Sequence, residues 1–213
     1  MKMLTHNRRS LALHKLRAGD GLPLLLLHGL AETSAIHRLD QYDVWLGPVF
    51  AMDLVGHGHS DSSIGHGYSP EGLLSDVDIA VAELDRCAVA GRGLGAYLAL
   101  MIAGARPEQV VGCVLLDGPG LRGGGPESNV LPASWHATAG SEKPDPYVLI
   151  ELSTDVRPPN YATKYAQLAA RNPHHALPIS IVAHNRPAWL AAVADMPTAT
   201  ATNLTDALNS YQG

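Results

Sequence analysis

A glycine-rich stretch, "CAVAGRGLGAYLALMIAG" at residues 87–104, has the pattern of a strand, a tight corner and a helix. Small residues on both sides of such a corner let the strand and the helix approach each other, and Gly91 and Gly95 supply them. A side chain at the apex would point into a cleft, where a serine can act as a nucleophile. The apex here is Gly93, which has no side chain and cannot attack a carbonyl carbon. The stretch therefore predicts a corner built for chemistry without its reacting group.

The segments around this corner alternate between strand and helix patterns. Short apolar runs predict buried strands at "LPLLLLHG", "PVFAMDL", "RCAVAG" and "QVVGCVLLDG". Ser69 and Pro70 predict the start of one helix, and a second helix follows the corner and ends near Pro107. The order of these elements predicts an α/β fold with a mostly parallel, doubly wound sheet and right-handed crossovers.

The segment at residues 119–177 interrupts this alternation. It is rich in Gly, Pro and Ser, with short helix patterns at "YVLIELSTDV" and "YATKYAQLAARN". A strand at "LPISIVAHNR", a helix opened by Pro187 and an edge strand in "TATAT" follow. We expect a core domain formed by residues 1–118 and 178–213, with a lid- or cap-like insertion at 119–177. We also expect a shortened C-terminus whose final helix is missing or cut to a turn.

Four motifs stand in the order seen in the α/β-hydrolase superfamily, whose members include esterase- and lipase-like proteins. The sequence resembles that family over about residues 8–118 and, more loosely, over residues 178–204. "LPLLLLHGL" resembles the strand that ends in His-Gly beside the oxyanion hole, and "MDLVGHGHSD" resembles the D-x-x-G-x-G-x-S loop. "AVAGRGLGAYLAL" resembles the G-x-S-x-G nucleophile elbow, and "VVGCVLLDG" resembles the next core strand. The resemblance implies backbone N–H groups that bind a carboxylate or carbonyl oxygen, at Gly29, Leu30, Ala31 and Leu94.

The catalytic triad that this resemblance implies is not matched by the chain. Gly93 stands at the nucleophile position, and Asn185 stands near the usual acid. The segment after the last predicted strand has no histidine, and Asp206 lies roughly where the base is expected. A serine hydrolase mechanism therefore has no support from these residues.

Three other residues are candidates for acid–base chemistry. Asp117 stands where some family members place the acid, and its alternative role is to cap a turn before Gly118. His184 ends a core strand and is the best substitute base, while His28 belongs to the His-Gly motif.

These observations leave three functions open. The first is a non-catalytic hydrolase-like protein, whose cleft binds a partner protein or a small molecule bearing a carbonyl or carboxylate. The second is an active hydrolase of ester- or amide-type substrates, with water activated by His184 or His28 together with Asp117. The third is a structural protein that forms a homodimer through its surface helices and the edge of its final strand.

Composition argues against several other classes of partner and location. The formal net charge is −5 and the only basic run is Arg8–Arg9, so we expect no nucleic-acid binding. No apolar run approaches the roughly 20 residues that span a bilayer, and no secretory signal is visible. We expect a cytoplasmic protein whose two cysteines, Cys87 and Cys113, are reduced and buried.

The glycine- and histidine-rich segments predict no cofactor and no metal. "GRGLGA" provides G-x-G-x-G instead of the dinucleotide-binding G-x-G-x-x-G, and no acidic residue follows at the required distance. "GHGHSDSSIGHG" contains His57, His59 and His66, but their spacing does not match a helix-face metal motif such as H-E-x-x-H.

Overall fold

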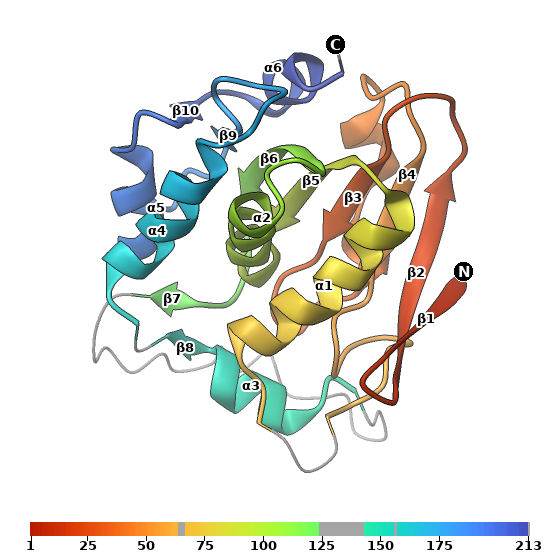
Figure 1. Cartoon of the computed structure of the whole chain (residues 1–213). Helices are drawn as coiled ribbons and strands as arrows, with labels where there is room; N and C mark the ends of the chain where they lie inside the picture. The colour runs from red at the N-terminus through yellow and green to blue at the C-terminus, as the bar shows by residue number, and fades with distance from the viewer. Residues whose placement is uncertain (64–66, 124–142, 156, 213) are drawn as a thin grey trace.

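The computed structural model describes residues 1–63, 67–123, 143–155 and 157–212 (Figure 1). The strands of its main sheet are β1 (Lys2–His6), β2 (Arg9–Arg17), β3 (Leu24–Leu27), β4 (Val49–Met52), β5 (Cys87–Arg92), β6 (Val110–Leu116), β9 (Ile179–Ile181) and β10 (Ala199–Ala201). They lie in the order β1-β2-β4-β3-β5-β6-β9-β10. β2 is antiparallel to β1 and β4, and the other neighbours are parallel. The predicted α/β fold with a mostly parallel sheet is confirmed.

Helices cover both faces of this sheet. They are α1 (Pro70–Leu84), α2 (Leu94–Ala105), α3 (Pro146–Leu152), α4 (Pro159–Ala169), α5 (Ala188–Ala194) and α6 (Leu204–Ser210), with two 3-10 turns, η1 (Ser34–Ile36) and η2 (Leu39–Tyr42). One apolar core packs the helices from α1 through α5 against the sheet face that carries Leu25 and Leu27. A second core joins η2 and α6 to the opposite face, which carries Leu24 and Leu26. The four leucines of β3 are buried because both faces are covered, as their continuous apolar run predicts.

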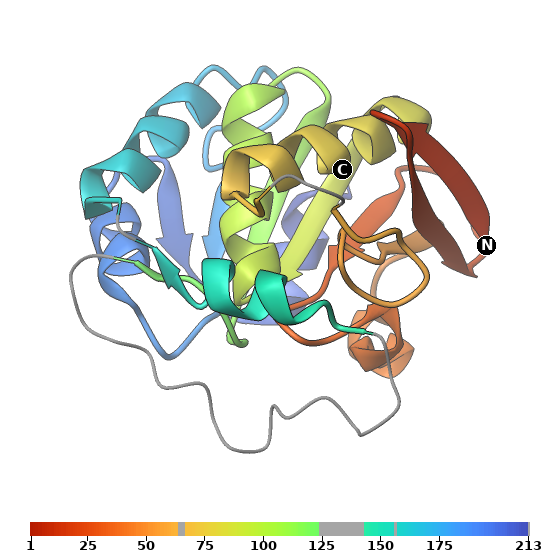
Figure 2. The ribbon, with the colours of Figure 1, turned by 90° about the horizontal axis from the view of Figure 1, so that it is seen from below.

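Helix α2 lies at the centre of the first core, between α1 and α4 (Figure 2). Its residues from Leu94 to Gly104 are all buried, so it has no solvent-facing stripe. Gly104 permits close packing, since a Cβ atom there would meet the backbone oxygen of Tyr165 in α4 at 2.5 Å. Helix α2, which begins at the glycine corner, is therefore enclosed along its length by the core.

The end of the chain differs from the expectation. We expected the final helix to be missing or cut to a turn, but residues Leu204–Ser210 form the seven-residue helix α6. Asn203 caps it, because its side chain accepts a hydrogen bond from the N–H of Asp206. Leu208 and Tyr211 pack beneath the sheet, which explains why this short helix is stable.

Part of the predicted insertion packs on the core. The described residues of 119–177 include α3, α4 and the paired two-residue strands β7 (Arg122–Gly123) and β8 (Thr154–Asp155). α4 buries Ala162, Ala166 and Ala169 in the core around α2. Residues 124–142 lie outside the described part of the chain, and the boundaries of a lid or cap stay a prediction.

Two features of the surface bear on partners. β10 is an edge strand of three residues, and a homodimer through this edge stays a prediction. Within the described residues, no helix combines the length and the apolar character needed to cross a bilayer.

Candidate functional site at the glycine corner

The glycine corner joins β5 to α2 through a backbone conformation that favours glycine. Gly93 has φ +55° and ψ −116° and is the N-terminal cap residue of α2. A Cβ atom at Gly91 would lie 2.0 Å from the backbone oxygen of Gly95, and one at Gly95 would lie 2.4 Å from that of Leu27. These two glycines let α2 begin directly against β5 and β3.

The space that a nucleophile would occupy is filled by the backbone after β6. A Cβ atom at Gly93 would lie 2.1 Å from the carbonyl oxygen of Pro119 and 2.5 Å from the carbonyl carbon of Gly118. The same Pro119 oxygen accepts hydrogen bonds from the N–H groups of Leu30 and Leu94, both at 2.9 Å. A carbonyl oxygen of the chain itself therefore occupies the place where an oxyanion hole would hold a substrate oxygen.

The backbone donors that we expected to be free for a ligand are all engaged. Besides Leu30 and Leu94, Gly29 donates to Oε2 of Glu32 at 2.8 Å, and Ala31 donates to Nε2 of His57 at 3.1 Å. Their availability cannot be judged from a motif, because it depends on how neighbouring loops fold over the hole. This part of the prediction is wrong for the structure described.

His28 is a structural residue, contrary to its candidacy as a base. It is completely buried, and its Nε2 accepts a hydrogen bond from the N–H of Leu54 at 3.0 Å. Its Nδ1 therefore carries the proton and donates to the carbonyl oxygen of Gly29 at 2.7 Å. Burial, together with the neighbouring His57, lowers the pKa of His28 to about 3. With both nitrogens engaged, the ring fixes the His-Gly strand end and has no free position for a substrate.

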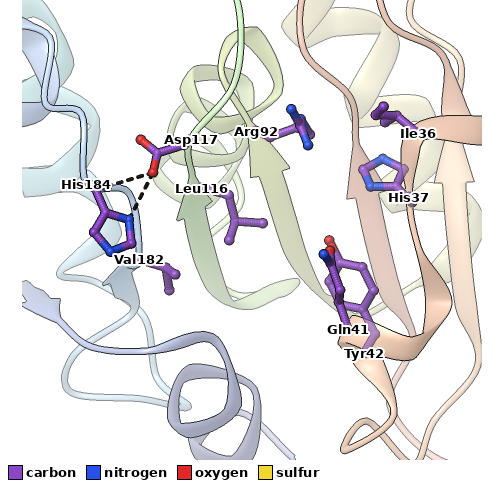
Figure 3. A pocket seen from close by; sticks show the side chains of 9 residues that line it. All are labelled: Ile36, His37, Gln41, Tyr42, Arg92, Leu116, Asp117, Val182 and His184. Atoms are coloured by element: carbon purple, nitrogen blue, oxygen red, sulfur yellow. Dashed lines mark hydrogen bonds and ion pairs between the residues drawn. The ribbon is translucent and has the colours of Figure 1, made fainter.

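Asp117 and His184, in contrast, lie together at the ends of β6 and β9 (Figure 3). Oδ2 of Asp117 accepts from the His184 backbone N–H at 2.9 Å and pairs with the His184 Nδ1 at 3.1 Å. Oδ1 accepts from the backbone N–H of Asn185 at 2.8 Å. Partial burial raises the Asp117 pKa, but these donors outweigh it and hold that pKa below its usual range. The carboxylate orients an imidazole that is 92% exposed.

This pair forms one wall of a pocket between β5, β6 and β9 and the turns η1 and η2 (Figure 3). Its volume is about 180 Å³, below the roughly 300–1,000 Å³ of sites that take drug-sized ligands. The lining residues are Ile36, His37, Gln41, Tyr42, Arg92, Leu116, Asp117, Val182 and His184. None of them is a serine, threonine or cysteine, so the pocket lining offers no ordinary acyl nucleophile.

Two polar pocket residues escaped the sequence analysis. The Arg92 Nε lies 2.9 Å from Oε2 of Glu32, without hydrogen-bond geometry, and its side chain is 34% exposed. Burial and the Arg92 charge lower the pKa of His37 to about 4, so this ring is neutral at pH 7. Nε2 of His37 is buried without a hydrogen-bond partner among the described residues. Arg92 stands beside the corner apex, which is a usable sequence signal, whereas nothing in the sequence marks His37.

The remaining predicted positions have structural roles. Asp206, which stands roughly where the family's histidine is expected, lies in the first turn of α6 and does not line the pocket. Cys87 and Cys113 are free thiols, and burial raises the pKa of the Cys87 thiol to about 12. Neither cysteine lines the pocket.

Sequence comparison identifies partial relatives. The chain is 35% identical over 113 residues to lipase LipV of Mycobacterium tuberculosis, covering 49% of this chain and 41% of that protein. It is 36% identical over 110 residues to esterase Rv0045c of the same organism, covering 50% of this chain and 36% of the relative. The chain thus spans about two fifths of the length of the curated relatives it matches.

Structure comparison finds solved structures that are similar to about half of this chain. The epoxide hydrolase of Bacillus megaterium superimposes with a TM-score of 0.49 at 25% identity, covering 55% of this chain and 42% of that chain. A family model described as "Alpha/beta hydrolase family" matches residues 24–212, which is most of the sequence. With the strand order, the glycine corner and this match in agreement, the chain belongs to the alpha/beta hydrolase family.

Proposed function

We propose that this protein uses the pocket to bind a small molecule bearing a carboxylate or carbonyl group, and that it does not form an acyl-enzyme. One observation carries the absence of an acyl-enzyme: the Pro119 oxygen accepts from Leu30 and Leu94 and fills the space beside Gly93. Acyl transfer needs a nucleophile and a place for the developing oxyanion. The described chain has no nucleophile at its corner, and its own backbone fills the place for the oxyanion.

Arg92 and His37 favour a ligand with oxygen acceptors. A guanidinium presents a planar set of donors that matches a carboxylate, and the Arg92 side chain is 34% exposed although its Nε lies beside Glu32. The neutral ring of His37 lines the same pocket, and its buried Nε2 has no hydrogen-bond partner among the described residues. The small volume favours a short carboxylic acid over a long acyl chain.

Calorimetric titration with acetate, propionate and benzoate tests the binding function. We expect saturable binding of at least one of these acids, and we expect Arg92→Gln to weaken it at least tenfold. Arg171→Gln is the matched control, because Arg171 is an exposed arginine that does not line the pocket. No binding of any acid, or equal affinity in Arg92→Gln and the native protein, would contradict the proposal.

A fluorophosphonate probe tests the absence of an acyl-enzyme. We expect no covalent labelling and no burst with p-nitrophenyl acetate. Labelling of any residue at a stoichiometry near one would show that a nucleophile exists, and the non-catalytic function would then be wrong.

A second function is supported by the contact between Asp117 and His184. An imidazole held by a carboxylate through Nδ1 can take a proton from water through Nε2, which would allow hydrolysis of an ester without a protein nucleophile. If this function operates, Asp117→Asn lowers the rate of p-nitrophenyl acetate hydrolysis at least tenfold without changing the fold by circular dichroism. A rate equal to the buffer rate in the native protein excludes it.

A further inference from the structure

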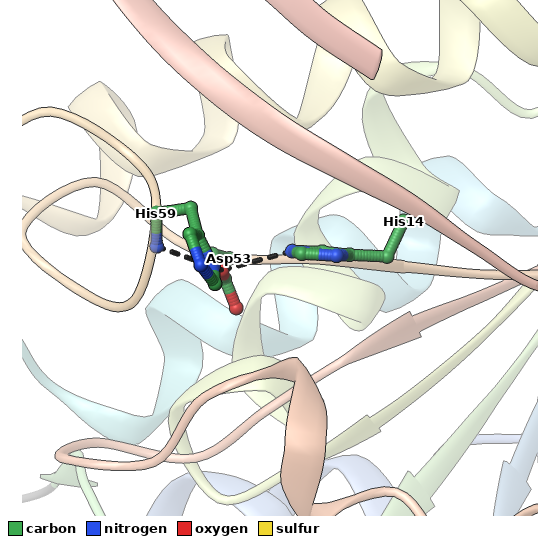
Figure 4. A group of neighbouring side chains, drawn as sticks. All are labelled: His14, Asp53 and His59. Atoms are coloured by element: carbon green, nitrogen blue, oxygen red, sulfur yellow. Dashed lines mark hydrogen bonds and ion pairs between the residues drawn. The ribbon is translucent and has the colours of Figure 1, made fainter. Parts of the chain in front are cut away.

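A second group of reactive side chains lies away from the pocket lining, on the antiparallel side of the sheet. His14 comes from β2, Asp53 follows β4, and His59 lies in the glycine loop after it. One ligand atom from each, two imidazole nitrogens and a carboxylate oxygen, lies within 4.8 Å of the others. Figure 4 shows the carboxylate of Asp53 between the two rings. Within the described residues this is the one place where three such groups meet.

The two distances from the carboxylate to the rings match what a small divalent cation requires. Oδ2 of Asp53 lies 3.0 Å from Nε2 of His14 and 3.3 Å from Nδ1 of His59. Zinc–ligand bonds of about 2.0–2.2 Å in a tetrahedral arrangement place neighbouring ligand atoms roughly 3.3 Å apart. The two ring nitrogens lie within 4.8 Å of each other, so the rings, which are edge-to-face with centroids 5.5 Å apart, would turn toward a common cation to bind it.

The carboxylate is positioned by its surroundings and does not depend on the two rings. Oδ1 of Asp53 accepts from the backbone N–H of Ser34 at 2.8 Å, and Oδ2 accepts from the backbone N–H of His59 at 2.9 Å. The Asp53 side chain is only 2% exposed. Two backbone donors thus fix the carboxylate before any cation arrives, as in sites with an ordered outer shell.

A glycine keeps the space beside the carboxylate open. Gly58 has φ +48°, and a Cβ atom there would lie 2.3 Å from Oδ2 of Asp53. The side chain of His59 is 68% exposed, so the site faces solvent on that side. A water molecule would complete the coordination from there. The histidine ligand on β2 lies outside the "GHGHSDSSIGHG" segment, which is why inspection of that segment alone predicts no metal site.

We propose that His14, Asp53 and His59 form a binding site for a divalent transition-metal ion, with Zn²⁺ as the best match. Two imidazoles and one carboxylate are a ligand set that suits zinc, with a fourth position left for water. In the structure described, ring N–H groups directed at Oδ2 take the place that the cation would fill. The bound ion would join β2, β4 and the glycine loop, and this site is independent of the ligand proposed for the pocket.

Zinc titration of the full chain tests this site. After treatment with a chelator and buffer exchange, we expect calorimetry with ZnCl₂ to show one equivalent bound. His59→Ala should weaken binding at least tenfold, and because its side chain is exposed the fold should persist by circular dichroism. His14→Gln is the second variant, and it should also weaken zinc binding. His174→Ala is the matched control, since His174 is an exposed histidine in another loop.

Cobalt substitution supplies a readout of geometry. Co²⁺ should give visible absorption bands of a four- or five-coordinate site in the native protein and in His174→Ala, and these bands should be lost in His59→Ala. The inference is overturned by zinc binding well below one equivalent, by unchanged affinity in His59→Ala and His14→Gln, or by an equal loss in His174→Ala, which would indicate adventitious binding to surface histidines.

Discussion

Installing a serine at the corner gives the most demanding test of how the nucleophile position is occupied. In Gly93→Ser, the new Cβ would meet the Pro119 oxygen at 2.1 Å, so the backbone at 118–119 must move. That movement breaks the hydrogen bonds from Leu30 and Leu94, which contribute about 1 kcal/mol each. The φ of +55° adds about 1–3 kcal/mol of strain for a residue with a side chain. We therefore expect a total destabilisation of about 3–5 kcal/mol.

Gly21→Ser is the matched control for this substitution. Gly21 also has a positive φ, +110°, but a Cβ atom there meets nothing within 4 Å. The control should therefore show backbone strain alone, about 1–3 kcal/mol. The difference of about 2 kcal/mol between the two variants reports the two hydrogen bonds to Pro119.

Urea unfolding followed by tryptophan fluorescence measures both free energies, and a fluorophosphonate probe is applied to the same samples. We expect Gly93→Ser to stay unlabelled, because the chain has no histidine at the family's usual position to activate the new serine. Equal stability of Gly93→Ser and Gly21→Ser would refute the reasoning about the Pro119 backbone, and covalent labelling at residue 93 would show that a nearby base can activate the serine.

Two further substitutions test the packing and the electrostatics of the corner. Gly95→Ala should destabilise the fold by about 1–3 kcal/mol, because its Cβ would lie 2.4 Å from a backbone oxygen. The control Gly72→Ala in α1 should be neutral or stabilising. Equal urea midpoints of the two variants would contradict this prediction. Lowering the pH from 7.5 to 5 should reduce the free energy of unfolding of the native protein by about 2 kcal/mol through His28. The reason is that the unfolded chain protonates this imidazole near pH 6.5 and the folded chain only near 3. His28→Gln should lose that part of the pH dependence of unfolding, and exposed His174→Gln should keep it.

Much of the scaffold could be predicted from local patterns. The run of leucines in β3 marks a strand buried on both faces, and the small residues around Gly93 mark a strand–helix corner. The sequence places Asp117 and His184 at strand ends, and neighbouring parallel strands bring such ends to one edge of the sheet. The pairing of these two side chains in space follows from that topology.

Other features depend on contacts that no local pattern reports. The Pro119 oxygen reaches the N–H groups of Leu30 and Leu94 only through the path of the backbone after β6. The pocket role of His37 depends on η1, a turn without a strong sequence signal. Helix α6 is different, because Asn203 and Asp206 form a recognisable N-terminal capping pattern that should have predicted it.

The group of His14, Asp53 and His59 also depends on contacts between segments that are distant in the sequence. His14 and Asp53 are far apart in the sequence and meet because β2 pairs with β4, with His14 opposite Ala51. A search along the glycine loop finds His59 but cannot find the ligand contributed by the neighbouring strand.

The occupied oxyanion hole is tested most directly by NMR of the native protein. An experiment that detects scalar coupling through hydrogen bonds should show cross peaks from the amides of Leu30 and Leu94 to the carbonyl carbon of Pro119. The ladder between β5 and β6 gives the internal reference in the same spectrum. Cross peaks from both amides to Pro119 are the predicted result. Their absence while the reference couplings are visible, together with rapid hydrogen exchange at both amides, would show that the hole is open and would contradict the proposal that the chain fills it.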